Sequence, residues 1–308
     1  MRTSYRRCFD STALLFFLLC DTLFCAPAVK IGQNFTASTF GVDSPAIPPD
    51  ANGAIGPKHF VEFINGRFAV FDKTNGQLVF GTSDIKFWTN AGVTITGTQD
   101  VTDPRTVYDP SSGRWFVSMV DENLASRRQV ANRFLIAVSA TSDPTAAWHG
   151  FAIPSSSLNY FADFPTLGID SNGAYVSGDL FDRFQNPVGP IVVSIPKSSL
   201  LATPPSTAGF TSSGVLSYAS RGDILQSAVT TGNATTPEVV LAVGDLGLDF
   251  QPHSTLILSD FQNSSGSLTL SGRTVLTVPA YNLPINPRQP SGTDNLDDGD
   301  ARISAFAR

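Results

Sequence analysis

Three aspartates at the start of repeated segments are the residues whose type and spacing could do chemistry. Asp50, Asp103 and Asp163 each precede a short strand-like run, and Asp163 follows Asp103 by 60 residues. Two carboxyl groups placed roughly 5–10 Å apart across a glycosidic bond act as acid and as base or nucleophile. We therefore take these three aspartates as candidate catalytic residues, provided that the fold brings them to a common axis.

Other polar residues stand at corresponding places in the repeats, and we expect them to contribute to ligand binding. They are Asn52, Arg105, Asp223, Asp300 and Arg302. Asp50 and Asn52 could also supply oxygen ligands to Ca²⁺, although the segment lacks the later acids of a full calcium loop. Apart from this Ca²⁺, no cofactor is expected. The simpler alternative is that an acid before a proline fixes the entrance of a strand, and that an acid before a glycine turn caps that turn.

A repeated sequence motif indicates the strands and turns that must position these residues. Asp109–Ser118 and Asp170–Ser177 both run from Asp through a glycine turn into an aromatic residue and a strand. A repeat of about 60 residues built from short strands predicts a β-propeller of four-stranded antiparallel blades. Asp109 and Asp170 lie inside the turns, so we expect them to be turn caps.

The predicted propeller occupies residues 50–308, after an extended leader at 29–49. About four blades are expected, and a partial one follows them. The blades are placed at about 50–100, 103–160, 163–220 and 223–290, with the partial blade at 297–308. Asn65-Gly66 and Asn75-Gly76 predict hairpin turns in the first blade. The partial blade has two explanations: the chain is a fragment of a longer propeller, or its last strand completes a blade begun by the leader. A β-sandwich is the alternative fold.

Composition and the N-terminus indicate an exported protein. The 308 residues carry a net charge of −6, which argues against a nucleic-acid partner. Arg2, Arg6 and Arg7 precede a short apolar run, and Ala26–Ala28 fits a cleavage site, so residues 1–28 are predicted to be a signal peptide. The three cysteines all lie within it. We expect a secreted, extracellular or periplasmic protein without a membrane span, without disulfides and without a cysteine nucleophile.

Several segments resemble one family. They are Pro48–Val61, Asp103–Asp109, Ala137–Pro144 and Phe161–Gly168. In their order along the chain and in their residue sequences, they resemble a group of secreted, mostly uncharacterised bacterial-type β-propeller proteins. More distantly, the pattern is similar to sialidase-like and five-bladed glycosidase propellers, a resemblance that implies acids on the innermost strands around a central channel. The Ser-x-Asp-x-Gly-x-x-Trp boxes of sialidases and the Glu-Gly-Pro segment of five-bladed glycosidases are not found in the sequence.

The sequence therefore favours a secreted binding or interaction module that engages a glycan, a peptide or a surface partner at the central channel. A glycoside hydrolase-like enzyme that uses the central carboxylates is the alternative. Trp88, Trp115 and Trp148 could line a sugar site, but tryptophans in propellers more often pack between blades.

Overall fold

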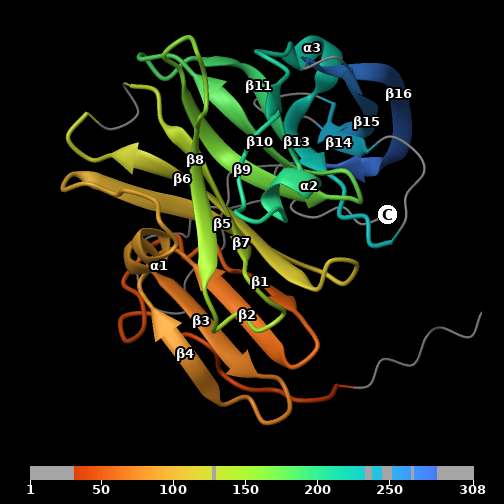
Figure 1. The fold of residues 1–308 in the computed structure, drawn as a ribbon. Coiled ribbons are helices and arrows are strands. Elements are labelled where there is room, and N and C mark those ends of the chain that lie inside the picture. Colours follow the sequence, from red (N-terminus) through yellow and green to blue (C-terminus); the bar gives the residue numbers. More distant parts are fainter. Residues whose placement is uncertain (1–30, 127–129, 233–237, 245–251, 265–266, 283–308) are drawn as a thin grey trace, which may run out of the picture. The chain divides into compact units, whose positions relative to one another are not determined.

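The structure is a computed structural model of the chain. It describes residues 31–126, 130–232, 238–244, 252–264 and 267–282. Two compact units are present, Met1–Asn34 and Phe35–Arg308, and all the helices and strands below belong to the second (Figure 1). The predicted signal peptide at 1–28 and the predicted partial blade at 297–308 lie outside the described residues.

Four antiparallel sheets, each of four consecutive strands, make up the described part of the second unit. We call them blades 1 to 4 in chain order. Blade 1 contains β1 (Asn52–Ile55), β2 (His59–Ile64), β3 (Arg67–Asp72) and β4 (Leu78–Thr82). Blade 2 contains β5 (Gln99–Asp109), β6 (Arg114–Asn123), β7 (Arg133–Ser139) and β8 (Trp148–Pro154). Blade 3 contains β9 (Phe161–Ile169), β10 (Gly173–Phe181), β11 (Pro187–Pro196) and β12 (Thr211–Ser212). Blade 4 contains β13 (Asp223–Ser227), β14 (Val239–Val243), β15 (His253–Ser264) and β16 (Ser267–Tyr281).

The first strands of successive blades pack against one another. β1 contacts β5, β5 contacts β9, and β9 contacts β13 (Figure 1). In a sandwich of two facing layers, the strands that begin successive repeats would not follow one another in this way. The fold is therefore the predicted β-propeller, with the first strand of each blade innermost.

Apolar side chains fill the space between the blades. One buried cluster joins blades 1 and 2, a second joins blades 2 and 3, and a third joins blades 3 and 4. Trp88, Trp115 and Trp148 all belong to the first cluster, and none is more than 9% exposed. The tryptophans therefore pack between blades, and none of the three is exposed enough to stack on a sugar ring.

Local sequence explains the hairpins of blade 1. Asn65-Gly66 joins β2 to β3 and Asn75-Gly76 joins β3 to β4, as predicted. Gly66 and Gly76 have φ angles of 88° and 74°, which a residue with a side chain rarely adopts. The turns therefore need glycine, and they fix which residues of β2, β3 and β4 face each other.

Among the described residues, three short helices lie between the strands: α1 (Asp84–Asn90), α2 (Lys197–Leu200) and α3 (Tyr218–Arg221). None of them is predictable from the sequence pattern, because seven residues or fewer show too little of a 3.6-residue period. In α1, the Ser83 side chain accepts a hydrogen bond from the Lys86 amide at 3.2 Å and begins the helix. Phe87 and Trp88 of α1 are buried against blades 1 and 2. No helix in the described part of the chain is long and apolar enough to cross a membrane.

A buried ion pair joins blades 2 and 3. Asp109 and Asp170 cap their turns as predicted, with Asp109 accepting from the amide of Ser112 at 3.1 Å and Asp170 from that of Gly173 at 2.8 Å. Lys197 Nζ lies 2.6 Å from Asp109 Oδ2 and donates to the carbonyl of Asp170 at 2.9 Å. Burial alone would raise the pKa of Asp109, but hydrogen bonds, first among them that of Lys197, outweigh it and lower the pKa.

Replacing Lys197 by Met should lower the free energy of unfolding by about 3 kcal/mol or more at pH 7, because Asp109 would remain buried without its cation. Urea unfolding measures this change. Since the folded pKa of Asp109 is lowered, the ion pair stabilises the protein above the ordinary Asp value of about 4 and is lost as pH falls further. The difference between the two proteins should therefore shrink in acid. Lys86→Met, at an exposed position, is the control; equal losses in both variants would contradict the account.

Candidate functional site

The entrance of every innermost strand carries the same irregularity. Just before or within each first strand, a step of three residues along that strand lies opposite a step of two residues along the second strand. The first strand therefore has one extra residue there, which forms a β-bulge. In each blade the residue in this bulge has a positive φ angle although it is not glycine. These residues are Asp50 (43°), Asp103 (60°), Phe164 (52°) and Ile224 (47°). Left-handed backbone at such residues costs about 1 kcal/mol or more each, so the surrounding contacts must hold it in place.

The position of the bulge shows which residues of successive blades are equivalent. The 60-residue step predicted that Asp103 and Asp163 are equivalent. In the structure Asp103 corresponds to Phe164, the other left-handed residue that precedes a proline, and Asp163 corresponds to Thr102. The prediction was therefore wrong by one residue, because the proline and the bulge, rather than the acid, mark the common position.

Side chains that follow the bulge reach across to the next blade. Oδ1 of Asn52 accepts from the Thr106 amide at 2.8 Å, and Nε of Arg105 donates to the Pro165 carbonyl at 2.9 Å. Thr166, in the same position of blade 3, donates to the carbonyl of Leu225 at 2.7 Å. Asn52 and Arg105, predicted to bind ligand, therefore already serve the junctions between blades.

A second set of side chains reaches the amide of the left-handed residue itself. Asn65 follows β2 and accepts from the Asp103 amide at 2.9 Å; its Nδ2 donates to Asp50 at 2.7 Å. Asp179 stands at the corresponding register position of blade 3 and accepts from the Ile224 amide of blade 4. An amide side chain in blade 1 and a carboxyl side chain in blade 3 thus make the same hydrogen bond.

Three carboxyl groups converge at the junction of blades 3 and 4. Asp163 lies opposite Asp179 in the β9–β10 ladder, and Asp179 shares a hydrogen bond with Asp223 of blade 4. Asp163 is 2% exposed and Asp179 is 3% exposed, whereas Asp223 is half-buried. Burial raises the pKa of Asp179 well above its ordinary value, and the hydrogen bond and charge of Asp223 and the charge of Asp163 raise it further. Asp179 is therefore a carboxylic acid that keeps its proton beyond the usual range.

Tyr218, at the start of α3, borders this carboxyl cluster. Burial raises the pKa of its phenol, and the charges of Asp179 and Asp223 raise it further. The phenol therefore stays protonated and neutral. With Asp223 it is the half-buried, more accessible side of a cluster whose other members are enclosed.

The structure brings together only some of the predicted site residues. Asp163 and Asp223 meet at the junction of blades 3 and 4, whereas Asp50 and Asp103 lie around Asn65 at the junction of blades 1 and 2. The convergence of Asp50, Asp103 and Asp163 stays a prediction of the sequence. Asp300 and Arg302 lie outside the described residues.

Sequence reasoning missed Asp179 and Tyr218. Asp179 comes near the end of β10, the second strand of blade 3, at the register position that Asn65 has just after β2 in blade 1. A comparison of the ends of second strands, in addition to the starts of first strands, could have found it. Tyr218 carries no sequence signal, because it is placed by a four-residue helix.

A metal site receives no support from the described residues, among which no group of three or more His, Cys, Asp or Glu side chains is arranged to hold an ion. Oδ1 of Asn52 accepts from the Thr106 amide and Asp50 accepts from Asn65, so both candidate Ca²⁺ ligands have other contacts. Binding of Ca²⁺ stays a prediction of the sequence.

Comparisons with known proteins find similarity in solved structures. No family model matches the chain, and no curated protein matches it. An exo-β-1,3-galactanase from Clostridium thermocellum is 10% identical, with a TM-score of 0.40, over 75% of this chain and 48% of that chain. The exo-β-1,3-galactanase from Phanerochaete chrysosporium with galactose is 11% identical, with a TM-score of 0.41, over 74% of this chain and 50% of that chain. The chain thus spans about half the length of these galactanases. A β-1,3-galactosidase of family GH43 with galactodeoxynojirimycin is 9% identical, with a TM-score of 0.39, over 72% of this chain and 75% of that chain.

Replacing Asp179 by Asn should stabilise the protein at alkaline pH, because the amide makes the same contacts without a proton to lose, as Asn65 does in blade 1. The raised folded pKa means that Asp179 stabilises the wild type fully below the ordinary Asp value of about 4. This contribution declines as pH rises through the raised pKa. At pH 8 we expect a melting temperature roughly 2–4 °C above that of the wild type.

Melting curves from pH 5 to 9 measure this effect. Asp182→Asn, at an exposed turn three residues further on, is the matched control and should leave the slope of stability against pH unchanged over this range. A D179N protein that melts below the wild type at every pH would contradict the protonated state of Asp179.

Proposed function

We propose that this protein is a carbohydrate-active, glycoside hydrolase-like β-propeller that works at the junction of blades 3 and 4. The observation that carries the proposal is the identity of residue 179. Asn65 makes the equivalent contact to the next blade in blade 1 with no ionisable group. A buried carboxyl in that position destabilises the fold at neutral pH, and functional sites are where such destabilising groups persist.

The chemistry of the cluster suits cleavage of an acetal. Hydrolysis needs one carboxyl that holds a proton for the departing oxygen and one carboxylate that accepts a proton from water or attacks the sugar. Asp223 is the half-buried member of the cluster and would meet the glycosidic oxygen. Asp179 would pass its proton to Asp223, which would protonate the departing glycosidic oxygen. Asp163 would be the second carboxylate, which accepts a proton from water or attacks the sugar. The neutral phenol of Tyr218 would donate a hydrogen bond to a sugar hydroxyl.

A binding module without catalysis is the second candidate, and the burial of the cluster favours it. Asp163 and Asp179 are almost fully enclosed. The hydrogen bond between Asp179 and Asp223 also brings two carboxyls closer than the separation of at least about 5 Å that glycosidases use. In this case the half-buried Asp223 and Tyr218 would bind a glycan, or an extracellular protein, and release nothing.

The N-terminal sequence supports an exported location for either activity. We propose that the mature protein is secreted, extracellular or periplasmic, where polymeric glycans are accessible. This part of the proposal depends on residues 1–28 and is independent of the carboxyl cluster.

Purified protein incubated with a panel of glycans, β-1,3-linked galactan among them, tests the function. Retention on each glycan and the release of reducing sugar are measured together. If the enzyme proposal holds, the wild type releases sugar, and Asp223→Asn lowers the rate by roughly 100-fold or more, the usual contribution of acid–base catalysis. Asp182→Asn should keep full activity.

The outcomes separate the two candidates. Retention without release, weakened in D223N, favours the binding module. Release of sugar that survives unchanged in both D223N and D179N would overturn the assignment of this cluster as the active site.

A further inference from the structure

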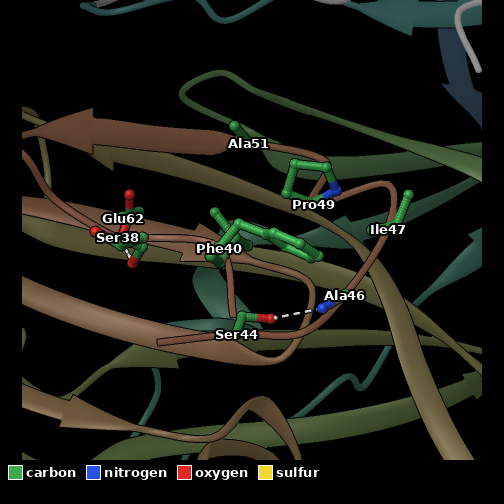
Figure 2. Close-up of a pocket in the computed structure, with 10 residues that line it drawn as sticks. Ser38, Phe40, Ser44, Ala46, Ile47, Pro49, Ala51 and Glu62 are labelled. Atoms are coloured by element: carbon green, nitrogen blue, oxygen red, sulfur yellow. Dashed lines mark hydrogen bonds between the residues drawn. The ribbon is translucent and has the colours of Figure 1, made fainter. Parts of the chain in front are cut away.

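A pocket lies on the face of blade 1 that points away from blade 2. Its cavity volume is about 390 Å³, and it is enclosed by the segment before β1 together with Glu62 and Ile64 of β2 (Figure 2). The lining side chains are Ser38, Thr39, Phe40, Ser44, Ala46, Ile47, Pro49, Ala51, Glu62 and Ile64. Phe40 and Ile47 are 65% and 66% exposed, so the pocket is an open apolar surface.

The position of this pocket is defined by the other three blades. Ala51 follows the left-handed residue of blade 1, as Pro104, Pro165 and Leu225 do in blades 2 to 4. These three counterparts are buried, and each lies at a junction that a side chain of the preceding blade crosses. Ala51 is exposed. The pocket therefore lies where an innermost strand of a preceding blade would pack.

The polar group of the pocket indicates which side chain that strand would present. Glu62 accepts a hydrogen bond from the Ser38 hydroxyl, and no cation of the described residues forms an ion pair with it. The nearby Arg67 pairs with Asp43 instead. In blade 2, Arg105 lies two residues after the left-handed Asp103 and donates to Pro165, the counterpart of Ala51. An arginine at the same place in a partner strand would reach both the Ala51 carbonyl and the Glu62 carboxylate.

The chain itself contains such a sequence. Asp300-Ala301-Arg302 repeats the Asp-Ala of Asp50-Ala51, and it carries an arginine where blade 2 has Arg105. The apolar residues Ile303, Ala305 and Phe306 follow and would suit the apolar lining.

We propose that this pocket receives residues 300–306 of the same chain as an innermost strand, with Arg302 donating to the carbonyl of Ala51 and pairing with Glu62. Arg302 would then repeat the contact of Arg105 with Pro165, which joins blade 2 to blade 3. The segment before β1 already covers the outer part of this face, where Phe35 packs against Phe60 and Phe71. The proposal is independent of the proposed function, because the pocket belongs to blade 1 and the carboxyl cluster lies at the junction of blades 3 and 4.

Charge reversal in the full chain tests the pairing. Glu62→Arg and Arg302→Glu should each lower the melting temperature by roughly 3 °C or more, because each places two like charges together. The double variant E62R/R302E should recover most of this loss. E62R/R308E, which reverses a neighbouring arginine, is the matched control and should recover nothing. If the reversed variants fail to fold, Glu62→Gln and Arg302→Met replace them, and their losses should be less than additive.

Three results would overturn the proposal. The first is a melting temperature for R302E within about 1 °C of the wild type. The second is equal recovery in the R302E and R308E double variants. The third is recovery that depends on protein concentration, which would show that a second copy supplies the arginine.

Discussion

Hydrogen bonds from one blade to the bulged start of the next are the interactions on which the rest of this structure depends. A buried amide without an acceptor costs about 1–3 kcal/mol. The Phe164 amide of blade 3 donates to its own neighbour Asp163 at 3.1 Å, whereas in blades 2 and 4 the acceptor comes from the preceding blade. Asn65 supplies the acceptor for Asp103, and Asp179 supplies it for Ile224. These contacts account for the positions of Asn65 and Asp179.

The same constraint explains why the carboxyl cluster exists. Any acceptor would satisfy the Ile224 amide, and blade 1 uses an amide side chain for this purpose. Blade 3 uses a carboxyl beside two further carboxyls, so a proton retained on Asp179 reduces the repulsion between the three groups. Stability alone would favour asparagine at position 179. The destabilising choice is physically meaningful because a proton held near a half-buried carboxylate is what acid catalysis requires.

Much of the fold could be predicted from sequence, and the site could not. The Asn65-Gly66 turn and the repeated Asp-turn-aromatic pattern specify local geometry, so Asn65-Gly66 joins β2 to β3 as predicted and Asp109 and Asp170 cap their turns. Asp163 and Asp223 were identified as candidates, but Asp179 was not. Its role arises from cross-blade register, which depends on one bulged residue that a 60-residue spacing does not reveal. Asn52 and Arg105 were singled out for their position, yet they bind the neighbouring blade.

The protonation state of Asp179 is the most direct test of the account. A titration of the side-chain carboxyl carbons by NMR, with D179N used to assign the signal, measures it. The account predicts that the Asp179 signal remains that of a protonated acid at a pH where exposed Asp side chains, with their ordinary value of about 4, have already lost their protons. A signal that titrates at that ordinary value would contradict it, because the junction would then hold no proton and the cluster would have no acid to offer.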